Sequence, residues 1–168
     1  KLNWTGNNLG VRELFYSYHP PASFLLTKAV MVLGFEPTKS IQIVAFFASI
    51  GAVLLFRSVL KKTGILSTAR GVMLLYIGAA IPLQLFLQTA ITIEVLVLFF
   101  TSLVLWLSVH LWWEPKGKPW SARSCVRAFI LSIVLAVALF TKFPAALLFA
   151  IPPAVAYLSP NRKHWQYV

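Results

Sequence analysis

The chain has 168 residues, of which 59% are hydrophobic and only 11% are charged, and its mean hydropathy is +0.80. A soluble domain carries about 25% charged residues, so this composition excludes a water-soluble globular domain and requires lipid as the solvent for much of the surface. The formal net charge of +11 is divided among short basic clusters between long apolar runs, which is typical of loops that flank membrane spans and argues against a nucleic-acid partner.

Residues 1–40 are predicted to form an external loop that ends in an interfacial helix. The apolar stretch from Ala22 to Phe35 is too short for a bilayer core of about 30 Å, which takes about 20 helical residues to cross. It follows Pro20-Pro21 and carries Lys28 near its middle, so we expect it to lie along the membrane surface. The chain then breaks at Glu36-Pro37, and Thr38 or Ser40 is expected to cap the next helix.

Five transmembrane helices are predicted within residues 41–159, followed by a cytoplasmic segment at 160–168. Their ranges are about 41–60, 71–88, 92–113, 125–141 and 143–159. Gly64 is expected to break the chain after the first of them. The segments 125–141 and 143–159 are near the lower length limit for a span, so each could be tilted or partly re-entrant. The predicted fold class is all-α, a polytopic transmembrane helix bundle with a short interfacial helix.

Lysine and arginine are divided unequally between the two ends of these spans. One end holds ten of them: Arg57, Lys61, Lys62, Arg70, Lys116, Lys118, Arg123, Arg127, Arg162 and Lys163. The other end holds five: Lys1, Arg12, Lys28, Lys39 and Lys142. Because cytoplasmic loops carry the excess of basic residues, the end with ten is predicted to be cytoplasmic. The N-terminal segment then lies on the non-cytoplasmic side of a plasma, inner or endoplasmic-reticulum membrane, and we expect a further span upstream of Lys1.

The histidine of Tyr18-His19-Pro20-Pro21 is a candidate substrate-binding group on the predicted outer side. The two prolines hold the backbone after it in an extended form, which fixes the histidine near the bilayer surface. In that position it would act as a hydrogen-bond donor or an acid–base group for a polar substrate. A turn whose aromatic residues lie in the interfacial belt explains the same residues without such a role.

Lys142 and Glu94 are the other two candidates on this side. Lys142 follows a largely apolar run at a helix–helix turn, where its ammonium would either reach the interface along its own stem or bind a phosphate. Glu94 is the only acid among the predicted spans, just inside the outer end of the third. It would pair with Lys142, hold a sugar hydroxyl or lie in headgroup water.

Two longer stretches resemble a known family. Tyr16-Ser17-Tyr18-His19-Pro20-Pro21-Ala22-Ser23-Phe24-Leu25-Leu26 resembles the His-Pro-Pro turn of the GT-C-type glycosyltransferases that use polyprenyl-phosphate sugars. This family includes protein O-mannosyltransferases and lipid A aminoarabinose transferases. Ala136-Val137-Ala138-Leu139-Phe140-Thr141-Lys142-Phe143-Pro144 is similar to the family's apolar run ending in Thr-Lys-Gly-Pro, with Phe143 where glycine is usual. Glu94 occupies a place where the family often has an acid that opens a span.

The resemblance implies that the chain corresponds to the N-terminal half of a membrane enzyme. Such an enzyme moves a sugar from a dolichyl or undecaprenyl phosphate to a protein, lipid or glycan acceptor on the non-cytoplasmic face. Lys142 would stabilise the phosphate leaving group. His19, with Tyr18 and Pro20, would shape the donor or acceptor pocket, and Glu94 would contribute to substrate binding.

One departure from the family concerns its catalytic acid, which lies early in the first external loop. The sequence contains no Asp, and Glu13 is too close to the histidine turn to take that place. The acid is therefore expected upstream of Lys1, or this member is inactive. Some relatives use a divalent metal, but no ligand set for one is identified here, and the single cysteine, Cys125, excludes a thiolate cluster.

Two other functions remain open on the sequence. A transporter or lipid-flipping subunit would place polar groups near the bilayer midplane and show an inverted repeat. The candidate residues lie instead at the outer face, and no repeat is found in the sequence. A non-catalytic membrane scaffold would gain support if the upstream loop lacked an acid.

Overall fold

The computed structural model describes residues 22–87, 93–113, 121–139 and 143–159, and these residues contain helices and connecting turns but no strand. The α-helices are α2 (Ala22–Met31), α3 (Pro37–Lys62), α4 (Ala69–Leu87), α5 (Ile93–Trp112), α6 (Ala122–Leu139) and α7 (Ile151–Leu158). Two 3-10 segments accompany them, η1 (Ile65–Ser67) and η2 (Phe143–Ala150). The all-α prediction is confirmed.

Within the described residues, three helices are long and apolar enough to cross a bilayer, over Pro37–Lys62, Val95–Trp112 and Ala122–Leu139. They coincide with the first, third and fourth predicted spans, and they identify an integral membrane protein. Shorter apolar helices cover Ala69–Ile81 and Ala146–Leu158, where the other two spans were predicted. A crossing by these two segments stays a prediction.

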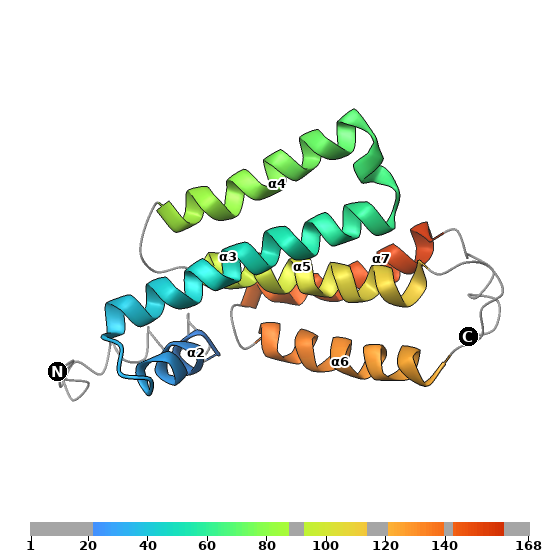
Figure 1. Cartoon of the computed structure of the whole chain (residues 1–168). Helices are drawn as coiled ribbons and strands as arrows, with labels where there is room; N and C mark the ends of the chain where they lie inside the picture. The colour runs from blue at the N-terminus through green and yellow to red at the C-terminus, as the bar shows by residue number, and fades with distance from the viewer. Residues whose placement is uncertain (1–21, 88–92, 114–120, 140–142, 160–168) are drawn as a thin grey trace.

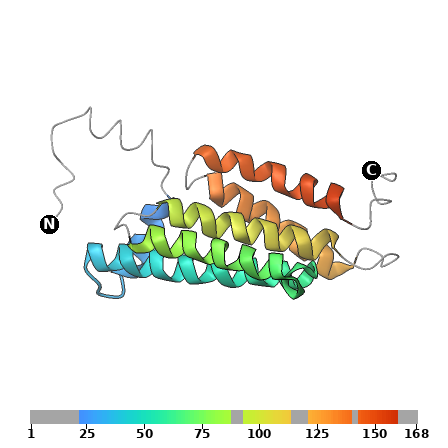
Figure 2. The ribbon, with the colours of Figure 1, turned by 90° about the horizontal axis from the view of Figure 1, so that it is seen from above.

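α5 is the centre of the bundle (Figure 1). It packs against α3 on one side and against α6 and α7 on the other, while α4 lies outside α3 (Figures 1 and 2). From Val95 to Trp112 its sequence contains no Lys, Arg, Asp or Glu. A helix that is apolar all round is buried by its neighbours, which explains why α5 takes the central position.

α3 carries small buried residues, and one of them, Ala48, packs in the same cluster as α5. Ala45, Ala48, Ser49 and Ala52 recur at helical spacing on α3, and all four are buried. Ala48 belongs to the same buried cluster as the α5 residues from Val95 to Leu107. Small side chains let two helix backbones approach closely, which is the main source of packing energy between helices in lipid. The Ser49 hydroxyl donates to the Ala45 carbonyl at 2.8 Å, so this buried serine leaves no unsatisfied donor.

Three side chains tie the helices together near the end where α5 finishes. Trp106 Nε1 on α5 donates to Ser58 Oγ on α3 at 3.0 Å. Arg127 Nη1 donates to the His110 carbonyl at 2.8 Å, and Ser159 Oγ donates to the Trp112 carbonyl at 2.6 Å. The last carbonyls of a helix have no partner within it, so the last two bonds satisfy groups that lipid could not.

The start of α3 differs from the prediction, whereas its end agrees. The helix begins at Pro37, and its N-cap Glu36 makes no side-chain cap bond. The expectation that Thr38 or Ser40 caps the helix is wrong, because Ser40 Oγ donates backwards to the Glu36 carbonyl at 2.9 Å. Proline suits the first helical position, where its missing N–H would be unpaired anyway. The helix ends at Lys62, and Gly64 follows with a φ of 77°, as expected of a helix-ending glycine.

Residues 143–158 are divided between η2 and α7 because two prolines interrupt them. Pro152 and Pro153 are the second and third residues of α7. Neither has an N–H to donate to a carbonyl four residues earlier, so a single α-helix through this region would lose two hydrogen bonds. At the start of α7 the missing donors are tolerated.

Replacing Ala52 by leucine should destabilise the bundle. Ala52 on α3 is 2% exposed, and extra methyl groups there should reduce stability by about 1–3 kcal/mol. The exposed Ala80 on α4 provides the matched control, since the same Ala→Leu change faces the surroundings there. Thermal unfolding in detergent should show a lower Tm for Ala52→Leu and an unchanged one for Ala80→Leu. Equal Tm values for both variants would contradict close packing around Ala52.

Candidate functional site

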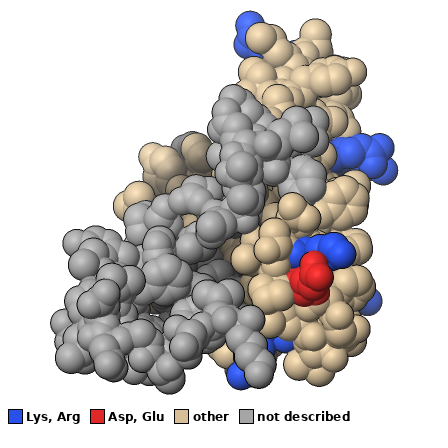
Figure 3. Space-filling model, turned by 90° about the vertical axis from the view of Figure 1, so that its left-hand side faces the viewer, with Lys and Arg blue, Asp and Glu red and all other residues tan. Residues whose placement is uncertain are grey.

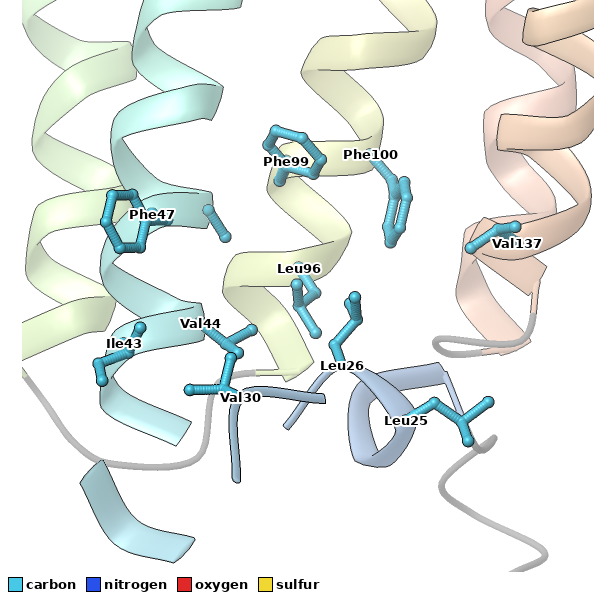
Figure 4. Close-up of a pocket in the computed structure, with 11 residues that line it drawn as sticks. Leu25, Leu26, Val30, Ile43, Val44, Phe47, Leu96, Phe99, Phe100 and Val137 are labelled. Atoms are coloured by element: carbon cyan, nitrogen blue, oxygen red, sulfur yellow. The ribbon is translucent and has the colours of Figure 1, made fainter. Parts of the chain in front are cut away.

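An apolar groove of about 620 Å³ lies at the end of the bundle where α3 and α5 begin and α6 ends (Figure 4). Four helices line it with apolar side chains alone: Leu25, Leu26 and Val30 of α2, Ile43, Val44, Phe47 and Ala48 of α3, Leu96, Phe99 and Phe100 of α5, and Val137 of α6. The groove therefore offers shape and apolar contact, and its described lining offers no hydrogen bond.

The arrangement of the helices explains the opening. α3 and α6 both pack on α5, and α2 packs against α3 at this end of the bundle. Phe99 and Phe100 project from α5 in a T-shaped pair, with ring centroids 5.6 Å apart, and form part of the wall. The inner residues Leu96 and Phe100 are 5% and 7% exposed, so the groove reaches down to the buried core.

The residues predicted to bind substrate adjoin this groove along the chain. Glu94 is the second residue of α5, two positions before the groove residue Leu96, and only its backbone is described. Tyr18, His19, Pro20 and Lys142 lie outside the described residues. Lys142 follows the groove residue Val137 by five positions, and Pro20 precedes the start of α2 by two. Whether their side chains meet stays a prediction.

The groove itself was not predicted from the sequence. Its residues were interpreted as ordinary parts of an interfacial helix and of spans. The side chains that line an opening and those that fill a core are of the same residue types and recur at the same helical spacing, so the sequence pattern does not distinguish them. The only local signal is the pair Phe99-Phe100 opposite small residues of α3, and that relation depends on how the helices are placed side by side.

The two ends of the described bundle differ strongly in charge. The groove end carries Lys28 and Lys39, and Lys39 Nζ lies 3.6 Å from the Glu36 carboxylate. Both partners are mostly exposed, so this pair contributes little stability. Figure 3 views that end, with the acidic group in red beside a basic one. The opposite end carries Arg57, Lys61, Lys62, Arg70, Arg123 and Arg127. The predicted orientation, with the more basic end in the cytoplasm, depends on this distribution of Lys and Arg.

Among the described side chains, no group of three or more His, Cys, Asp or Glu residues could hold a metal ion. The described part of the site therefore supplies apolar contact, and a role for Glu94, His19 and Lys142 stays a prediction.

The predicted orientation can be tested with the single cysteine. Cys125 is exposed near the start of α6, at the end opposite the groove. A membrane-impermeant maleimide added to intact cells should leave Cys125 unlabelled until the cells are permeabilised. In a Lys28→Cys, Cys125→Ser variant, the new cysteine should be labelled from outside, because Lys28 lies at the groove end. Labelling of Cys125 in intact cells would place the groove on the cytoplasmic side.

No protein-family model, no curated protein and no solved structure matches this chain. The likeness to GT-C-type glycosyltransferases consequently depends on the sequence motifs alone.

Proposed function

We propose that this chain acts in a membrane glycosyltransferase that moves a sugar from a polyprenyl phosphate, dolichyl or undecaprenyl, to an acceptor on the non-cytoplasmic face. The observation that carries the proposal is the apolar groove, which lies on the chain segments adjoining His19, Glu94 and Lys142. A polyprenyl-phosphate sugar has the matching construction, a long apolar chain joined to an anionic and polar headgroup at the membrane surface.

The groove would hold the first part of the polyprenyl chain. Lipid tails are as apolar as the groove, so hydrophobicity alone gives no preference for entering it. Selection would come instead from packing of the branched, unsaturated chain against Leu96, Phe99 and Phe100. With the chain held there, the phosphate lies near the bundle end, where α6 finishes and the sequence continues to Lys142.

In this proposal the bond between the sugar C1 and the phosphate oxygen breaks while the acceptor oxygen bonds to C1. The polyprenyl phosphate leaves with an added negative charge, which the Lys142 ammonium would stabilise. The acceptor proton passes to a general base, which the family resemblance places upstream of Lys1. Glu94 and His19, with Tyr18 and Pro20, would bind the sugar hydroxyls and fix the donor relative to the acceptor.

A bulky residue in the groove should weaken lipid binding. In Val137→Trp the indole would occupy space at the groove wall on α6, and overpacking of this kind should lower affinity for polyprenyl phosphate by about tenfold. Ile133→Trp places the same residue one turn earlier on α6, at a position that is 47% exposed and does not line the groove. Retention of undecaprenyl phosphate by each purified variant can be measured by native mass spectrometry. Equal retention by both would show that the groove does not hold the chain.

Removing the candidate cation should reduce sugar transfer. In Lys142→Ala the departing phosphate loses its counter-charge, so kcat should fall by about 10²–10³-fold. His19→Ala should raise KM more than it lowers kcat if the histidine positions substrate. Lys28→Ala removes a cation from the same end and should remain within about twofold of the wild type. The measurement is release of polyprenyl phosphate from a labelled donor by the full-length protein in membranes. No turnover by the wild type with any polyprenyl-phosphate sugar would reject the enzymatic proposal and favour a scaffold.

A further inference from the structure

The turn between α3 and α4 gathers cations that no described carboxylate neutralises. Arg57, Lys61 and Lys62 lie in the last turns of α3, and Arg70 is the second residue of α4. We refer to these four as the basic hairpin, and all four are exposed. The sequence from 37 to 93 contains no acidic residue. The acid whose side chain is described, Glu36, lies at the other end and pairs there with Lys39.

The placement of these charges is unfavourable for the helices themselves. Arg57 and Lys61 are four residues apart, so they lie on the same face of α3 and repel one another. Arg70 stands in the first turn of α4, where the helix dipole disfavours a cation. Lys61 and Lys62 are placed favourably at the negative end of α3. A bound anion would relieve both unfavourable placements at once.

The neighbours of the basic hairpin indicate what kind of anion this is. Ile65 in the turn is 41% exposed, and Leu54, one turn before Ser58 on α3, is 56% exposed. Val72 and Met73 in the first turns of α4 are 43% and 65% exposed. Exposed apolar side chains on both sides of a cluster of cations fit the boundary between acyl chains and headgroups, and they do not fit a water-facing surface for nucleic acid or an acidic protein.

We propose that the basic hairpin is a binding site for the phosphodiester headgroups of anionic phospholipids in the leaflet that it faces. This inference is independent of the proposed glycosyl transfer, since it involves the end of the bundle opposite the groove. The hydroxyl groups of the turn already donate to backbone carbonyls, so the cations would make the contacts with the headgroup. Ser67 Oγ donates to the Gly64 carbonyl at 2.7 Å, and Thr68 Oγ1 donates to the Ile65 carbonyl at 2.8 Å.

The test compares two double variants that remove the same charge from opposite ends. Lys61→Gln with Lys62→Gln neutralises half of the basic hairpin, while Lys28→Gln with Lys39→Gln removes two cations from the groove end. Each protein is reconstituted into phosphatidylcholine vesicles. The quantity measured is the association of spin-labelled phosphatidylglycerol relative to spin-labelled phosphatidylcholine. The wild type should prefer phosphatidylglycerol. In the first variant, each cation removed should reduce that preference about fivefold. The second should stay within about twofold of the wild type.

Two further measurements exclude trivial explanations. Lys61→Arg with Lys62→Arg keeps the charge and should keep the preference, which separates loss of charge from loss of structure. On the wild type, 1 M NaCl shortens the Debye length to about 3 Å and should abolish the preference without any mutation. No preference in the wild type, or equal loss in both double variants, would overturn the proposal. Displacement of the lipid by inorganic phosphate at matched ionic strength would also overturn it, by indicating a site for soluble anions.

Discussion

Hydrogen bonding of the backbone is the constraint on which this architecture depends, because the interior of a bilayer supplies neither donors nor acceptors. Every peptide group at that depth has to find its partner within the chain, so the described residues are helical almost throughout. The same constraint acts on hydroxyl side chains. Thr101 and Ser108 on α5 each donate to the carbonyl four residues earlier, at 2.7 Å in both cases. A helix can thus carry polar residues and still be packed on all sides.

Helix positions were predictable because hydropathy and chain breaks are local properties of the sequence. The third predicted span, 92–113, differs from α5 by one residue at each end, and Gly64 was correctly identified as a break. The early start of α3 was missed since Pro37 was interpreted only as an interruption, although proline is also well suited to begin a helix. The 3-10 form of η2 was missed because an apolar run predicts burial and does not distinguish one helical form from another.

Contacts between helices could not be derived in the same way. The bond from Trp106 to Ser58 joins positions 48 residues apart, and the bond from Arg127 to the His110 carbonyl needs the relative rotation of α5 and α6. For the candidate site, the residues predicted from motifs have no described side chains, so their part in it stays a prediction. The groove depends on the spacing of four helices, which no pattern within one helix specifies.

A 3-10 helix is longer per residue than an α-helix, and this difference affects how the last described segment fits a bilayer. At about 2.0 Å per residue the eight residues of η2 extend about 16 Å, and at about 1.5 Å the eight residues of α7 add about 12 Å. The total of about 28 Å is close to the thickness of a hydrocarbon core, whereas a wholly α-helical segment would reach only about 24 Å. If η2 took α-helical hydrogen bonding, the segment would shorten by about 4 Å, which is comparable to the difference in thickness between cellular membranes. If residues 143–158 cross the bilayer as predicted, the 3-10 form of η2 therefore sets how thick a membrane the segment fits.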